Sequence, residues 1–266
     1  MTARTLARVA GVLYLVTFVT SIPALALKRP YLQTGAGVDA LRWAAALEVV
    51  LALACLGTAV ALYPITRRYQ PALILGFVGS RTLEAATIVL GVVSMLAVAS
   101  IGGPATPGAQ ALVAVHDWAF LIGPGTLPAV NALLLAPVLL KARLVPRAVP
   151  LVGLVGAPLL LGAALAELLG ALDQVSLLGG LAALPIALWE LSLGLWLTVR
   201  AVPHVAVPTE PGEVVRLREM TTDVGSVPAE CGETSQNRSS FHERRRSRVS
   251  VGRSRTVTPD ATSPAN

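Results

Sequence analysis

Six long apolar segments constrain this chain more than any other feature of its sequence. They cover residues 9–27, 40–64, 71–99, 111–139, 148–170 and 176–199. A bilayer core about 30 Å thick needs about 20 apolar residues per crossing helix, and each segment reaches about that length. A helix satisfies its backbone hydrogen bonds internally, as lipid requires. The sequence therefore predicts an all-α fold: a polytopic transmembrane helical bundle of about six helices.

The composition argues against a soluble protein and against nucleic-acid binding. The chain is 54% hydrophobic and 14% charged, whereas soluble domains carry about 25% charged residues. The net charge is +6, but the charged residues lie mainly at the ends of the apolar segments and in a polar tail. Aromatic residues make up only 5%, so no stacking platform for bases is visible. We expect the lipid bilayer, and no nucleic acid, to be the main partner.

A change in composition divides the chain into a transmembrane domain, residues 1–200, and a polar tail, residues 201–266. The tail has no apolar period, so we expect it to be disordered. Its basic stretch "FHERRRSRVSVGRSR" either attracts anionic lipid head groups or is simply a solvated extension. Cys55 lies in an apolar segment and Cys231 in the tail, so no disulfide is expected.

The basic residues at segment ends predict the orientation. One side would carry most of them: Arg4, Arg8, Arg67, Arg68, Lys141, Arg143, Arg147 and Arg200. The other would carry Lys28, Arg29 and Arg42, offset by Asp39. The positive-inside rule then predicts a multi-pass protein of the cell (plasma) membrane with both termini in the cytoplasm. The first segment could instead be a cleaved signal peptide, but its apolar run is long for one.

Ionisable residues inside the apolar segments are the candidates for function, because a charge at the bilayer centre costs about 2.5–3.5 kcal/mol. They are Glu48, Arg81, Glu84, Glu190 and, nearer a segment end, His116, Asp117 and Glu167. At about 100° per residue, each of Glu48, Glu84 and Glu190 shares a helix face with small residues. Small faces allow helices to approach closely, so these carboxyl groups should point into the bundle.

Arg81 and Glu84 are three residues apart and are predicted to form an ion pair. Glu48 and Glu190 are expected to have no basic partner in the core, so each would be protonated, bind a cation or line water. Two interpretations remain open. The polar residues either fix the register of the helices or form a pathway for protons or a solute.

The fourth segment contains "HDWAFLIGPGTLPAVN", in which Gly123-Pro124-Gly125 and Pro128 fall in mid-span. Proline removes a backbone hydrogen bond, so a kink or an interrupted helix is expected, and broken helices often carry transporter sites. Asn131 would share a face with Asp117 on a straight helix. His116-Asp117 is interpreted as a solvated helix-entry cap, with a proton site as the alternative.

Signatures of soluble enzymes are not found: the sequence has no G-x-x-x-x-G-K-[ST], H-E-x-x-H, C-x-x-C or G-x-S-x-G. No catalytic residue, metal or cofactor is therefore predicted, since one His and one Asp are too few ligands for a metal. A membrane-embedded enzyme would need His116 and Asp117 beside a cavity. The leading hypothesis is a small transporter or permeation protein that uses Glu84 with Arg81 at its centre. The alternative is a non-transporting structural or accessory protein.

Several blocks of sequence resemble a known family. They are "RVAGVLYLVTFVTSIPAL" (8–25), "GSRTLEA" (79–85), "HDWAFLIGPG" (116–125), "VPRAVPLVGLVGAPLLL" (145–161) and "LWELSLGLWL" (188–197). Together they resemble the bacterial integral membrane proteins catalogued as domain of unknown function 4386. The resemblance covers roughly residues 5–200 and implies a bacterial helical membrane protein. It implies no substrate, cofactor or catalytic residue.

Overall fold

A computed structural model describes residues 2–173 and 176–200, which form seven helices and, within those ranges, no strand. The helices are α1 (Ala3–Thr34), α2 (Val38–Thr66), α3 (Pro71–Ser100), α4 (Ala109–Ile122), α5 (Leu127–Ala142), α6 (Ala148–Leu168) and α7 (Leu177–Val199). With α4 and α5 counted as one span, six are long and apolar enough to cross a membrane. The predicted all-α bundle is confirmed, and this is the fold of a multi-pass membrane protein.

Local chemistry explains where several helices begin and end. Thr2 precedes α1 and its hydroxyl accepts the backbone N–H of Thr5 at 3.2 Å. Ser176 caps α7 in the same way, accepting from Gly179 at 3.0 Å. Such caps satisfy donors that have no partner inside the helix. Gly35 ends α1 with a φ of 77°, a left-handed conformation that glycine adopts without steric cost.

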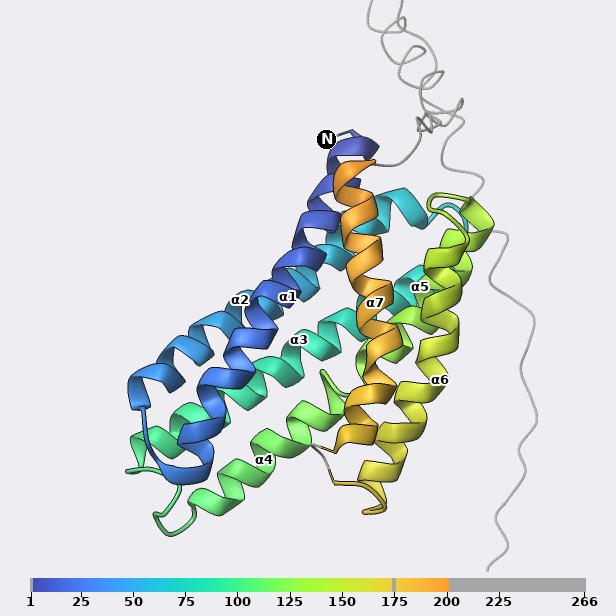
Figure 1. The fold of residues 1–266 in the computed structure, drawn as a ribbon. Helices are drawn as coiled ribbons and strands as arrows, with labels where there is room; N and C mark the ends of the chain where they lie inside the picture. The colour runs from blue at the N-terminus through green and yellow to red at the C-terminus, as the bar shows by residue number, and fades with distance from the viewer. Residues whose placement is uncertain (1, 174–175, 201–266) are drawn as a thin grey trace, which may run out of the picture. The chain divides into compact units, whose positions relative to one another are not determined.

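Six helices form a ring in which α2, α1, α7, α6, α5 and α3 each pack against the next, and α3 closes on α2; α4 packs against α3. Figure 1 shows the start of α1 next to the end of α7. We name this end of the bundle, with the connections 67–70 and 143–147, the N-terminal side. On the opposite side lie the connections 35–37 and 101–108, the end of α6 and the start of α7.

The predicted interruption of the fourth span is confirmed, because α4 ends at Ile122 and α5 starts at Leu127. The protein itself satisfies the backbone groups that the break releases. The N–H of Gly125 donates to Phe120 O at 2.9 Å, and the hydroxyl of Thr126 donates to Leu121 O at 2.7 Å. Irregular backbone at membrane depth persists only with such partners or beside a cavity.

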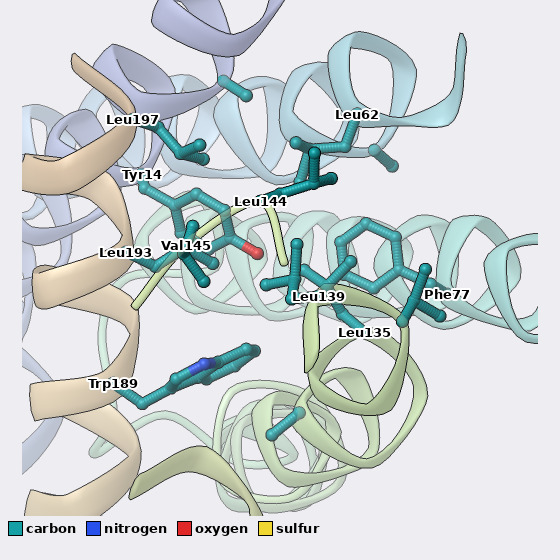
Figure 2. Packing of buried hydrophobic residues seen from close by; sticks show 14 of the residues in the cluster. Tyr14, Leu62, Phe77, Leu135, Leu139, Leu144, Val145, Trp189, Leu193 and Leu197 are labelled. Carbon is teal, nitrogen blue, oxygen red and sulfur yellow. The ribbon is translucent and has the colours of Figure 1, made fainter. Parts of the chain in front are cut away.

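A large hydrophobic core fills the N-terminal half of the bundle, and Figure 2 shows the packing of part of it. It includes Tyr14, Leu62, Phe77, Leu135, Leu139, Leu144, Val145, Trp189, Leu193 and Leu197. Trp189 is completely buried and lies against Gly153, where an added Cβ would be 2.8 Å from the indole ring. Helices α1 and α7 also cross closely: a Cβ on Gly11 would lie 2.5 Å from the Thr198 hydroxyl. Glycine at these positions lets the helices pack at close range.

The structure extends the first span well beyond the apolar segment 9–27, since α1 reaches Thr34 and includes Lys28. Lys28, counted in the sequence with the basic residues of the opposite side, has a buried side chain that is 2% exposed. The predictions for the tail, including its attraction to anionic lipid and the unpaired state of Cys231, concern residues outside the described ranges.

Candidate functional site

The half of the bundle on the opposite side contains two neighbouring cavities. The larger has a volume of about 390 Å³ and the smaller about 210 Å³. Residues that line both are Ser21, Leu25, Leu51, Ile88, Phe120 and Pro124. The interruption of the fourth span leaves room for these cavities. Helix α5 packs in the ring against α3 and α6, whereas α4 packs against α3. The residues at the break, including Pro124, therefore line the cavities instead of filling them.

The deep end of the larger cavity is formed by a buried cluster centred on Arg81, which is 1% exposed. Its Nη1 donates to Glu84 Oε2 at 3.0 Å, which confirms the predicted pair within α3. Its Nη2 donates to Glu190 Oε1 on α7 at 2.7 Å. Asn131 on α5 donates from Nδ2 to Glu84 Oε2 at 2.7 Å. We call Arg81, Glu84, Asn131 and Glu190 the inner cluster.

The prediction that Glu190 has no basic partner is therefore wrong, because Arg81 serves both carboxylates. The separation of 109 residues between Arg81 and Glu190 is bridged by the packing of α7 into the ring. One guanidinium faces two carboxylates, so the cluster carries one excess negative charge when all three are ionised. An excess charge at this depth is costly unless a proton or a cation neutralises it.

Aromatic and sulfur groups complete the surroundings of Arg81. Its guanidinium lies 4.9 Å from the centre of the Tyr14 ring, and its Nη1 is 3.7 Å from the sulfur of Cys55. Tyr14 belongs to the hydrophobic core, and Trp189 of that core precedes Glu190 in the chain. The inner cluster thus marks the boundary between the packed half and the hollow half of the bundle.

The smaller cavity contains a second buried ion pair. Lys28 Nζ on α1 donates to Glu48 Oε1 on α2 at 2.5 Å, and the two residues are 2% and 7% exposed. Lys28 Nζ also lies 4.8 Å from the centre of the Phe120 ring. The prediction that Glu48 has no basic partner is therefore wrong. The inward orientation predicted for Glu48 and Glu84 agrees with their burial.

His116 and Asp117 lie in the middle of α4, and Gly108, not Asp117, occupies its N-cap. The interpretation of this pair as a solvated helix-entry cap is therefore wrong. His116 is buried and lines the smaller cavity, and its Nδ1 is 2.9 Å from Asp117 Oδ1. This places an imidazole next to the cavity that holds Lys28 and Glu48.

The larger cavity reaches the opposite side at Glu167 and Ser176, where α6 ends and α7 begins. We call this end of the cavity its mouth. Between the mouth and the inner cluster most of the lining is apolar, and it includes Phe18, Leu160 and Ile186. Small residues on α7 keep the space open. They are Gly179, Gly180, Ala183 and Ala187.

The structure brings the predicted site residues into two groups that share a wall. Arg81, Glu84, Asn131 and Glu190 form the inner cluster, and Glu48 and His116 line the smaller cavity. Lys28 was missed by the sequence reasoning, although a signal exists: on a helix it shares a face with Thr17, Ser21 and Ala24. In the described part of the chain, no three His, Cys, Asp or Glu side chains gather closely enough to hold a metal ion.

Comparison with known proteins places the chain in a family. Residues 9–201 match the family model described as domain of unknown function (DUF4386). Neither the curated proteins nor the solved structures include a match to this chain. The matched range contains all of the residues that line the two cavities.

Proposed function

The chain belongs to the DUF4386 family of unknown function, and we propose from its site that it is a small proton-coupled membrane transporter. The observation that carries the proposal is the position of the inner cluster. Buried carboxylates that outnumber their basic partner lie at the deep end of a cavity of about 390 Å³. Ionisable groups at such a position are typical of proton and substrate pathways.

The division of the bundle into two halves supports this proposal. The cavity extends from Glu167 at its mouth to Arg81 at its deep end. Beyond Arg81 the hydrophobic core closes the N-terminal half, with Tyr14 and Trp189 both fully buried. A site reached from one side and closed on the other is one of the two states that alternating access requires.

The proposal includes an orientation in the plasma membrane. The positive-inside rule counts Lys and Arg residues rather than net charge. The segment ends on the N-terminal side carry eight of them, against three on the opposite side. By this rule we place the N-terminal side in the cytoplasm, so that the cavity faces outward.

A non-transporting structural role is the alternative, and the same contacts favour it. The ion pairs and hydrogen bonds join α1 to α2, α3 to α7 and α3 to α5. Buried pairs of this kind can serve to specify which helices meet. This alternative predicts that the inner cluster contributes to stability and to no flux.

Proteoliposomes distinguish the two roles. The full chain is reconstituted with a pH-sensitive dye trapped inside, and a panel of cationic, anionic and zwitterionic small solutes is added outside under an imposed pH gradient. We expect at least one class to change the internal pH faster than in empty liposomes. Glu84→Gln should abolish that change. Asp39→Asn is the control and should retain it, because Asp39 belongs to an exposed ion pair with Arg42.

Two results contradict the transporter proposal. One is a rate equal to that of empty liposomes for every class of solute. The other is a full rate in Glu84→Gln together with a lower unfolding temperature, which supports the structural role instead.

A further inference from the structure

The charges around the larger cavity are unbalanced toward the acidic side. Among the described residues that line it, Arg81 is the only basic one, and it faces Glu84 and Glu190. Glu167 at the mouth adds a third carboxylate. Glu190 receives its hydrogen bond at Oε1, and among the described residues no donor binds its Oε2. The deep end of the cavity therefore suits a positive charge and disfavours an anion.

The size and the walls of the cavity indicate more than a bare ion. A volume of about 390 Å³ falls within the range of small-molecule pockets, roughly 300–1,000 Å³. Phe18, Leu25, Leu51, Ile88, Leu121 and Leu160 supply apolar surface. An inorganic cation would leave that surface unused, whereas an organic cation would bury its hydrocarbon part against it.

Resting on the proposed function, we infer that the larger cavity binds a monovalent organic cation with an apolar body, in exchange for one proton. The ammonium or equivalent group takes the place of the proton that neutralises the excess charge of Glu84 and Glu190. The hydrocarbon part lies toward the mouth, between α1, α6 and α7. The exchange balances: one cation enters, and one proton leaves a carboxyl group for the solvent.

Several titratable groups surround this exchange site. Arg81 on α3 binds both Glu190 and Glu84, and Tyr14 on α1 and Cys55 on α2 lie against Arg81. Glu167 on α6 lines the same cavity. Lys28, Glu48 and His116 line the neighbouring cavity. Among those in the larger cavity, only the two inner carboxylates share a single cation, so they are the groups from which the proton is released.

Isothermal titration calorimetry on the purified full chain in detergent tests the inference. The probe is benzyltrimethylammonium, a permanent cation with an apolar ring, and benzenesulfonate is the anionic control. We expect the cation to bind and benzenesulfonate not to bind. Exchange of one proton makes Kd fall by up to tenfold per pH unit as the pH rises. It also makes the binding heat depend on the ionisation enthalpy of the buffer.

Two pairs of variants locate the site. Glu190→Gln removes the excess charge, so the affinity should fall at least tenfold and the pH dependence should disappear, while Asp39→Asn changes neither. Gly180→Leu adds a bulky side chain at a residue that lines the cavity, where a Cβ meets no other atom within 4 Å. Gly162→Leu is its matched control, since that Cβ also meets nothing within 4 Å but lies outside the cavity lining.

The results separate this inference from the proposed function. Loss of binding in Gly180→Leu but not in Gly162→Leu supports the site even if Glu190→Gln does not fold. Absence of cation binding, binding of benzenesulfonate, or equal affinity in both glycine variants overturns the inference. Flux of an anionic or zwitterionic solute in the liposome assay would then leave the transporter proposal standing. Cation binding with no flux of any solute overturns the transporter proposal alone.

Discussion

The buried pair of Lys28 and Glu48 offers a quantitative test of the helix arrangement. Both side chains are almost fully removed from solvent, and their charged atoms are 2.5 Å apart. Removing one partner of a buried pair leaves an uncompensated charge and typically costs about 3–5 kcal/mol. We therefore expect Lys28→Met and Glu48→Leu each to lower the free energy of unfolding by about 3–5 kcal/mol.

The double variant, Lys28→Met with Glu48→Leu, should lose much less stability than the sum of the losses in the two single variants. Replacing a whole buried ion pair with apolar residues of similar volume is often neutral or stabilising. Lys28 also lies over the ring of Phe120, and the methionine keeps part of that contact because its sulfur interacts favourably with aromatic rings. We expect the free energy of unfolding of the double variant to lie within about 2 kcal/mol of that of the natural protein.

Reversible unfolding in mixed micelles, titrated with sodium dodecyl sulfate and followed by circular dichroism, measures these differences. The pair of Arg42 and Asp39 is the control: it has a similar N–O distance of 3.0 Å but side chains that are 68% and 84% exposed. Asp39→Ala should cost less than about 1 kcal/mol. Single variants that cost less than about 1 kcal/mol, with a double variant that is their sum, would refute a buried pair between α1 and α2.

Two further substitutions test other contacts by the same measurement. Asn131→Leu removes the hydrogen bond to Glu84 and should cost about 1.5–3 kcal/mol, since the acceptor is charged; no loss of stability would show that this bond is not formed. Gly153→Val forces a side chain against Trp189, where a Cβ already approaches to 2.8 Å, and should cost about 1–3 kcal/mol. Gly162→Val, with open space around its Cβ, is the matched control, and an equal effect in both would contradict the close packing of α6 on α7.

The sequence predicted the elements well because membrane insertion imposes a simple rule on length and hydropathy. Six spans were expected and six are found. The break in the fourth was expected from Gly123 and Pro124, whose effect on a helix is local. The contact between Arg81 and Glu84 was equally predictable, because residues three apart on a helix are neighbours.

Contacts between helices could not be predicted from the sequence. Glu190 and Glu48 were expected to lack basic partners, yet Arg81 and Lys28 bind them from other helices. Which helices are neighbours depends on side-chain packing across the whole ring, and no local pattern encodes it. The first helix is also longer than the apolar segment, since the charge of Lys28 ended that segment in the sequence while the helix itself continues to Thr34.

The separation of the bundle into a packed half and a hollow half has a consequence for how such a protein changes through evolution. Most of the burial of large apolar side chains lies in the packed half, around Tyr14, Phe77 and Trp189. Residues such as Gly180 and Ala187 in the hollow half touch the cavity and contribute little to that packing. In the proposed transporter, substitutions there alter the preferred solute while the fold keeps its margin of stability. One scaffold can in this way diversify in specificity without first having to be stabilised.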